Sequence, residues 1–378
     1  LCYNIFVHKI TFRYRLYPTA SQSAAMQHTL DECRWLYNHL LEQRKTAWEE
    51  RKESFTMYDQ INTFTALKQE RPPLTTVHSQ VLQNVAMRID LGFKAFFRRV
   101  KTGEKPGYPR FRGAGRYDSF TYPQGGYSVN PDSIRLSKIG TVKAVIHRPI
   151  EGNIKTCCVR LTSTGKWFVT FACEVEAQPL PESSEAVGID VGLESFATLS
   201  TGEAIANPRF FRKDDKALAK AQRRLSKEAK GTPARSKRRK VVAHIHERIS
   251  NRRTDFAHQN SRRIVNRFGV IAVEDLNINR MIHNHCLAKS IADAAWGQFA
   301  AFLSYKAGNA GGKFIAVNPA YTSQDCSQCG HRQKMSLSER EYQCPCCGLI
   351  LNRDHNASLN ILAVGLDSLG IVPRSPLL

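Results

Sequence analysis

The chain has 378 residues, 42% of them hydrophobic, which is enough for two or three domains with cores and excludes a disordered chain. Its 55 Lys and Arg against 33 Asp and Glu give a formal net charge of +22, so we expect a polyanionic partner, most simply nucleic acid. No apolar run approaches the ~20 residues of a transmembrane helix, and no amphipathic anchor or lipidation signal is present. We therefore expect no membrane partner and a protein of the cytosol or the chromosome.

The first predicted element is a strand at residues 3–17, where side chains alternate with period two. Its apolar face holds Phe12, Tyr14 and Leu16. Arg13 and Arg15 lie on the other face and are candidate nucleic-acid-binding residues. A half-buried strand with a solvated face would give the same pattern.

Apolar residues at helical spacing then predict two long helices, joined by a loop that contains Pro72 and Pro73. The first runs from Ser21 to about Trp48 and the second from about Thr76 to Val100. Their apolar positions are Met26, Leu30, Cys33, Tyr37, Leu40 and Leu41, and then Val81, Val85, Ile89, Phe93, Phe96, Phe97 and Val100. Apolar stripes of this kind more often pack in a protein core than take part in function, so we expect a small helical domain.

The segment 101–112 is basic, broken by Gly and Pro, and interleaved with aromatic residues. This composition suits phosphate contact and base stacking, although a solvated linker is the alternative. The candidate nucleic-acid-binding residues here are Lys105, Tyr108, Arg110 and Arg112.

Residues 117–176 carry short apolar runs separated by glycine turns, which predicts an all-β region. Together with the first strand it could close a small barrel that the helical segment interrupts. Residues 176–184 contain Pro179 and Pro181 and are typical of a linker.

Beyond the linker, residues 186–193 predict a buried strand with Asp190 inside it, followed by a hairpin across 196–206. A carboxylate in an apolar strand is costly unless it is paired or bound to a metal. A strand-end Asp in an ion pair is the alternative interpretation.

Residues 212–253 hold sixteen Lys and Arg against four Asp and Glu. We predict two basic helices that break at Gly231-Thr-Pro233. A segment with so large an excess of positive charge repels itself unless phosphates neutralise that charge. The candidate nucleic-acid-binding residues are Arg223, Arg224, Arg238, Arg239 and Lys240.

Two further carboxylates share the context of Asp190. Glu274 stands at the end of the buried strand 270–273, and Asp354 opens the last helix, where the helix dipole favours an anion. A helix over about Ala288–Ala307 and a strand at 314–317 lie between them in the chain. This order of strands, helices and acids describes an RNase H-like core, in which three carboxylates can hold two Mg²⁺ about 4 Å apart and hydrolyse phosphodiester bonds.

Two Cys-x-x-Cys pairs, each followed by Gly, flank a gap of fourteen residues. This is the ligand spacing of a zinc ribbon, with Cys326, Cys329, Cys344 and Cys347 as ligands. Disulfides would need an oxidising compartment, which nothing here indicates. Cys346 could replace Cys347, but the Cys-Pro-x-Cys-Gly pattern favours Cys347. The six other cysteines are expected to be reduced core residues.

Nearly the whole chain resembles the TnpB family, transposon-encoded proteins related to compact type V CRISPR effectors. Five motifs, in this order along the chain, are highly specific: Val273-Glu-Asp-Leu-Asn277, Asn318-Pro-Ala-Tyr-Thr-Ser-Gln324, Cys326-x-x-Cys329-Gly, Cys344-Pro-x-Cys347-Gly and Asn352-Arg-Asp-x-Asn356. The motifs Arg15-Leu-Tyr-Pro18, Gly107-Tyr-Pro-Arg-Phe-Arg112 and Gly188-Ile-Asp-Val-Gly192 add to the resemblance.

The resemblance implies an α+β multidomain protein. The implied domains are a wedge β-barrel (1–18 and 115–178), a helical recognition domain (19–114), a RuvC-like nuclease domain (185–318 and 349–366), a zinc ribbon (319–348) and a tail (367–378). It gives Asp190, Glu274 and Asp354 the catalytic, magnesium-binding roles and the four Cys the zinc.

The partners implied by the resemblance are a guide RNA from the transposon end, target double-stranded DNA and a partner transposase encoded by the same element. The expected location is the prokaryotic cytoplasm, in association with the nucleoid. The expected activity is RNA-guided DNA cleavage, with base pairing supplying the specificity. Two alternatives stay open: a non-catalytic nucleic-acid-binding regulator of transposition, and a transposase whose RNase H-like core joins strands.

Overall fold

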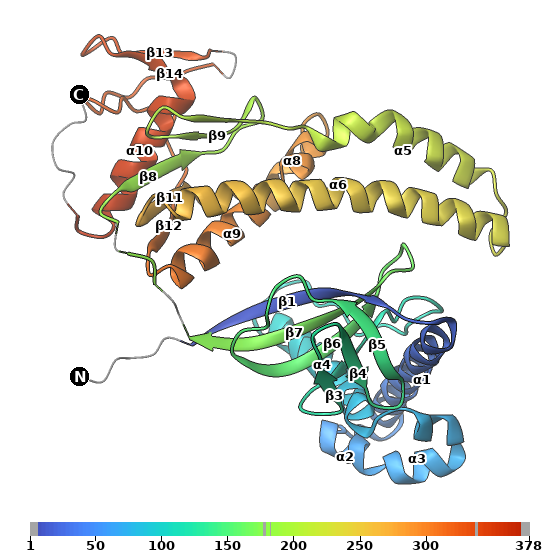
Figure 1. Ribbon diagram of the computed structural model, residues 1–378. Helices are drawn as coiled ribbons and strands as arrows, with labels where there is room; N and C mark the ends of the chain where they lie inside the picture. The colour runs from blue at the N-terminus through green and yellow to red at the C-terminus, as the bar shows by residue number, and fades with distance from the viewer. Residues whose placement is uncertain (1–6, 177–178, 182, 337–338, 372–378) are drawn as a thin grey trace, which may run out of the picture. The chain divides into compact units, whose positions relative to one another are not determined.

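The computed structural model describes every residue except 1–6, 177–178, 182, 337–338 and 372–378. The start of the first predicted strand, Cys2 and most of the predicted tail lie outside the described residues. The chain divides into two compact units, Leu1–Glu176 and Ala177–Leu378 (Figure 1).

The first unit contains a seven-stranded antiparallel sheet in the order β2-β6-β7-β1-β5-β4-β3. Its strands are β1 (Val7–Tyr17), β2 (Ser119–Tyr122), β3 (Tyr127–Val129), β4 (Ser133–Leu136), β5 (Gly140–Val145), β6 (Asn153–Leu161) and β7 (Trp167–Glu176). The predicted alternation of β1 is confirmed, since Phe12, Tyr14 and Leu16 are buried while Arg13 is exposed.

The sheet curls until it is nearly a closed barrel, as the ribbon shows (Figure 1). Its two edge strands approach each other through Tyr122 of β2, whose ring centroid lies 6.4 Å from that of Tyr127 in β3. The Tyr122 hydroxyl also donates a hydrogen bond to the carbonyl of Ser137, just beyond β4. The curvature encloses an apolar core, which satisfies the requirement to bury one face of each strand.

The helices of this unit follow β1 in the chain. They are α1 (Ala20–Arg51), α2 (Met57–Asn62), α3 (Phe64–Glu70), the 3₁₀ turn η1 (Pro72–Thr76) and α4 (Ser79–Lys101). A capping box starts α1, in which the Thr19 hydroxyl accepts from the Gln22 N–H and the Gln22 side chain accepts from the Thr19 N–H. The two long helices were predicted from their apolar periodicity, whereas the short α2 and α3 were not.

The prediction that the whole apolar stripe of α4 is core is wrong at its C-terminal end. Val81, Val85 and Ile89 are buried, but Phe97 and Val100 are more than half exposed. The buried residues of α4 all lie in its first half, so periodicity alone overestimates the core here.

The second unit is built on a five-stranded sheet in the order β10-β9-β8-β11-β12. The strands are β8 (Ala186–Asp190), β9 (Ser195–Leu199), β10 (Ala204–Ala206), β11 (Val270–Glu274) and β12 (Lys313–Val317). β8 is antiparallel to β9 and parallel to β11, which is parallel to β12.

The helices of this unit are α5 (Phe210–Ser226), α6 (Pro233–Val265), α7 (Ile278–Met281), α8 (Ala288–Ala294), α9 (Trp296–Asn309) and α10 (Arg353–Asp367). The C-terminal part of α6 and α9 cover one face of the sheet and α10 covers the other, whereas α5 packs against α6 away from the sheet. Ile271 and Val273 of β11 share a core with α6 and α9, whereas Ala272 between them contacts Ile361 of α10. The period-two alternation of β11 therefore directs α10 to one face and α6 and α9 to the other.

The close packing of α10 on β8 depends on Gly188. A Cβ at this position would overlap the backbone carbonyl of Ser358 in α10. Only glycine lets the helix backbone approach the strand so closely, and this approach brings the N-terminal turn of α10 to the end of β8.

Two predicted helices of this unit differ in extent from those in the structure. The basic segment breaks as expected before Pro233, although its second half continues without a break into the helix that carries Phe256, so α6 is one helix of 33 residues. The predicted single helix over Ala288–Ala307 is wrong: Ala295 adopts the left-handed conformation (φ 56°) and divides α8 from α9.

A small cysteine-rich module joins β12 to α10. It contains the hairpin β13 (Glu341–Gln343) and β14 (Ile350–Asn352), with Tyr342 fully buried beneath the cysteines. Among the described residues, no helix is long and apolar enough to cross a membrane.

Candidate active site and cysteine cluster

Asp190 and Glu274 end two neighbouring parallel strands. The residues directly before them, Ile189 and Val273, are register partners in the β8–β11 pair. Because the carboxyl ends of parallel strands meet at one edge of a sheet, both carboxylates come to the same edge.

Asp354 reaches this edge from the first turn of α10. The Asn352 side chain caps the helix by accepting from the N–H groups of Asp354 (3.0 Å) and His355 (3.2 Å). A Cβ built on Gly192, two residues after Asp190, would lie 4.0 Å from Asp354 Oδ2. The third predicted acid therefore faces the backbone that leaves β8.

The electrostatics of Asp190 shows that the three acids form one cluster. Burial, and after it the negative charges of Glu274 and Asp354, raises the pKa of Asp190 from 3.8 to about 8, while the neighbouring Arg353 acts in the opposite direction. Burial also raises the pKa of Glu274, and a hydrogen bond from Thr322 opposes that rise. A cluster of this kind favours either protonation or the binding of cations.

The three carboxylates are spread more widely than the ligands of a single ion. Among the described residues, only the four cysteines form a group of three or more His, Cys, Asp or Glu whose ligand atoms all lie within 4.8 Å of one another. A pair of divalent ions would need a wider ring of ligands than a single ion does. Three hard oxygen ligands in a partly buried setting fit Mg²⁺ by their chemistry.

Thr322 is a residue of this site that the sequence analysis did not single out. It is buried, and its hydroxyl donates a hydrogen bond of 2.6 Å to Glu274 Oε1. This bond fixes the side-chain rotamer of Glu274 at the sheet edge. Its only sequence signal was its place in the motif Asn318–Gln324, whose contacts could not be known before folding.

Two asparagines of α10 connect the same loop to the helix that carries Asp354. Asn360 donates to the carbonyls of Thr322 (2.8 Å) and Asp325 (2.7 Å). Asn356, fully buried, donates to the Asp325 carbonyl and accepts from the Ser327 N–H. The loop that holds Glu274, the helix that bears Asp354 and the first cysteine pair thus form one hydrogen-bonded assembly.

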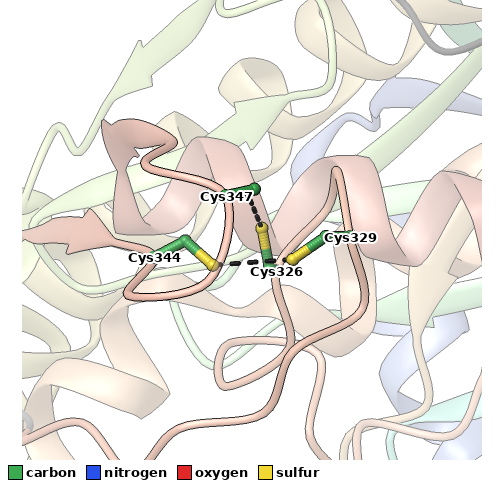
Figure 2. Close-up of side chains that lie close together, drawn as sticks. All are labelled: Cys326, Cys329, Cys344 and Cys347. Atoms are coloured by element: carbon green, nitrogen blue, oxygen red, sulfur yellow. Dashed lines mark hydrogen bonds between the residues drawn. The ribbon is translucent and has the colours of Figure 1, made fainter.

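The four predicted cysteines converge, as Figure 2 shows. The Sγ atoms of Cys326 and Cys347 are 3.6 Å apart, as are those of Cys329 and Cys344. A tetrahedral Zn²⁺ with Zn–S bonds of about 2.3 Å places its sulfurs about 3.8 Å apart, so the cluster fits this ion. The separations far exceed the ~2.05 Å of a disulfide bond.

The surroundings of the cluster agree with the sequence pattern. Gly330 and Gly348, which follow the two Cys pairs, both adopt positive φ (73° and 74°), a conformation that glycine accommodates readily. Cys347, not its exposed neighbour Cys346, joins the cluster. Elsewhere, Cys33, Cys157 and Cys173 are buried as predicted, but the exposed Cys286 contradicts the expectation of a core residue.

Two of the basic candidates of the first unit, the exposed Arg13 and the half-buried Arg15, lie beside an aromatic ring. The guanidinium of Arg13 lies 3.8 Å from the centre of the Phe168 ring, and that of Arg15 lies 5.2 Å from it. Tyr108 packs edge-on against Phe93 and Phe96.

The loop 101–112, which carries Tyr108, is anchored at Arg112, whose backbone forms two hydrogen bonds with the Asn38 side chain. Lys105 and Arg110 are exposed. The loop thus presents its cations to solvent while its backbone and Tyr108 are held.

The basic candidates of the second unit are exposed on α5 and α6. They are Arg223, Arg224, Arg238, Arg239 and Lys240. Of these, Arg238 forms an ion pair with Glu228 at 3.5 Å, so its charge is partly offset.

Comparison with known proteins agrees with this picture. Residues 170–285 match a family described as a probable transposase of the OrfB_IS605 type, and residues 296–361 match a Cas12f1-like TNB domain. Residues 8–53 match a helix-turn-helix domain associated with the same family. In the structure those residues form β1 and α1 rather than two helices joined by a turn.

Two relatives extend over almost the full length of the chain. A protein of Streptomyces pristinaespiralis that carries the name of an RNA-guided DNA endonuclease is 36% identical over 95% of this chain and 90% of its own. The protein InsQ of Escherichia coli K12, which carries the same name, is 31% identical over 94% of this chain and 92% of its own.

A solved structure shares the fold. The protein in a cryo-EM structure of a Cas12f1–sgRNA–target DNA complex aligns with a TM-score of 0.59 at 13% identity, over 94% of this chain and 98% of that one. Fold and site thus define a protein with a sheet-edge acid cluster and a four-cysteine module. The chain belongs to the TnpB family of RNA-guided DNA endonucleases.

Proposed function

We propose that this protein is an RNA-guided, Mg²⁺-dependent DNA endonuclease of a transposable element that cuts DNA at guide-matched sites. The observation that carries the proposal is the convergence of Asp190, Glu274 and Asp354 at one sheet edge, where burial and, after it, the charges of the other two acids raise the pKa of Asp190. The family relationship supplies the reaction class.

In this proposal the second unit contains a RuvC-like nuclease domain (185–318 and 349–366), and the three acids hold two Mg²⁺. The three carboxylates would hold these ions, which would supply activation of the attacking water and stabilisation of the leaving oxygen of the phosphodiester. Asp190 and Glu274 present their carboxylates from rigid strand ends, and the α10 cap holds Asp354 in place. Thr322 keeps Glu274 turned toward the other two acids.

The four cysteines would hold a structural Zn²⁺ in a ribbon over residues 319–348. Asn356 and Asn360 tie this ribbon to α10, so an ordered ribbon supports the position of Asp354 and, through Thr322, that of Glu274. Loss of the metal would loosen that support, since metal binding and folding are coupled in such modules.

The partners in this proposal are a guide RNA from the transposon end and the target double-stranded DNA. The formal charge of +22 and the exposed cations of β1, the 101–112 loop, α5 and α6 support them. The barrel of the first unit would be the wedge domain and its helices the recognition domain. Binding to DNA would associate the protein with the nucleoid.

The test is cleavage of a plasmid library by the purified protein with Mg²⁺ and RNA transcribed from just downstream of the gene. The library carries a guide-matched target beside a randomised flank. Cuts that require the matching RNA, together with none from Asp190→Ala that still binds RNA and DNA, would support the proposal. Tight RNA binding by an uncleaving wild type would favour the regulator, and strand-transfer products without RNA would favour a transposase.

A further inference from the structure

Tyr321 combines a strained backbone with an exposed aromatic ring. Its φ is 67°, a left-handed conformation that bulky side chains rarely adopt, and the residue is 50% exposed. Its carbonyl accepts hydrogen bonds from the N–H groups of Gln324 (2.8 Å) and Asp325 (3.0 Å), so a tight turn holds this conformation. Strain maintained by the surroundings is characteristic of functional positions.

Arg332 supports one face of this ring. Its guanidinium carbon lies 3.7 Å from the ring centre. The guanidinium is itself fixed by two hydrogen bonds to the Asp325 carboxylate, at 2.6 and 2.9 Å. The ring is therefore a rigid platform that is backed on one side and still half exposed.

The platform adjoins the proposed catalytic site. The next residue, Thr322, donates the hydrogen bond that holds Glu274. Asn356 and Asn360 of α10, the helix that carries Asp354, bind the Asp325 carbonyl. The tyrosine thus belongs to the same hydrogen-bonded assembly as the carboxylates and is placed with them.

We propose that Tyr321 stacks an unpaired nucleobase of the DNA strand being cut and so positions the neighbouring phosphodiester at the acid cluster. A half-exposed ring backed by a fixed guanidinium offers the flat, low-entropy surface on which bases stack, without preference for sequence. This inference rests on the proposed function and adds to it the group that holds the substrate strand.

The key variant is Tyr321→Asn, because Asn adopts positive φ more readily than other side chains and so removes the ring while retaining the turn. Tyr321→Phe preserves the stacking surface. Tyr305→Ala removes an aromatic residue of similar exposure from α9 and is the matched control. The melting temperature of each protein is measured first and should match that of the wild type.

The probe is guide-matched DNA with 2-aminopurine at successive positions around the cut, bound to the full protein–RNA complex in Ca²⁺. We expect Tyr321→Asn to raise the fluorescence at one or two adjacent positions only, and Tyr321→Phe and Tyr305→Ala to leave it at the wild-type level. Single-turnover cleavage in Mg²⁺ should be about tenfold slower for Tyr321→Asn and within about twofold of wild type for the other two.

Equal fluorescence of wild type and Tyr321→Asn at every position would overturn the inference, as would a Tyr321→Phe protein that behaves like Tyr321→Asn. The fluorescence measurement needs no cleavage. A wild type that shows the position-specific signal but does not cut would therefore count against the proposed nuclease function and not against the stacking surface.

Discussion

The raised pKa of Asp190 should make the stability of the magnesium-free protein depend on pH. The folded protein holds the Asp190 proton more tightly than the unfolded chain does, because the pKa rises from 3.8 to about 8 on folding. The corresponding stability is present at low pH and is lost as the pH rises through about 8. Asp190→Asn removes the titrating group with little change in size, so this variant should lose less stability over the same range.

The magnitude follows from the two pKa values. With a pKa of 3.8 in the unfolded chain and about 8 in the folded protein, ionisation of Asp190 lowers the free energy of unfolding by roughly 4 kcal/mol between pH 5 and pH 8.5. Because the residue keeps partial contact with solvent, we expect about 2–4 kcal/mol. For a unit of this size, that difference corresponds to roughly 5–15 °C in melting temperature.

The assay is thermal unfolding of wild type and Asp190→Asn across this pH range, in buffer without magnesium and without chelator so that zinc stays bound. Asp275→Asn, at an exposed carboxylate next to Glu274, is the control. Added Mg²⁺ should restore stability to the wild type at pH 8.5 and do so much less for Asp190→Asn. Parallel loss of stability in wild type and Asp190→Asn would refute the raised pKa of Asp190.

Three further predictions concern the supports of the site. Thr322→Val should raise the Mg²⁺ concentration for half-maximal thermal stabilisation about tenfold, and Thr322→Ser should restore it; equal values for all three proteins would contradict the role of the hydroxyl. Cys347→Ser should lose bound zinc while Cys346→Ser retains it, as measured by metal analysis. The reverse result would make Cys346, and not Cys347, the fourth zinc ligand. Gly188→Ala should lower the free energy of unfolding by about 2–4 kcal/mol because its methyl group overlaps the backbone of α10. A melting temperature unchanged in Gly188→Ala would contradict that packing.

Much of the local structure could be predicted from the sequence because periodicity reports burial directly. The alternation of β1, the buried stripe of α1 and the break before Pro233 all appear as expected. The cysteine cluster was also predictable, since its ligand spacing and the glycines that follow are local properties. Predictions failed where the apolar pattern does not report the final environment, at the end of α4, which stays exposed, and at the left-handed Ala295 between α8 and α9.

The chemical groups of the candidate site can be read from the chain alone: three carboxylates on apolar elements, four thiols at zinc spacing and a large positive charge. How these groups meet depends on the tertiary fold. The parallel pairing of β8 with β11 brings Asp190 beside Glu274, and the glycine that admits α10 brings Asp354 to them. The hydrogen bond from Thr322 to Glu274 joins segments that are distant in the chain. The stacking of Tyr321 on Arg332 depends on the strained backbone of Tyr321. No local pattern encodes such contacts, because they exist only once the sheet, the helix and the cysteine module have packed together.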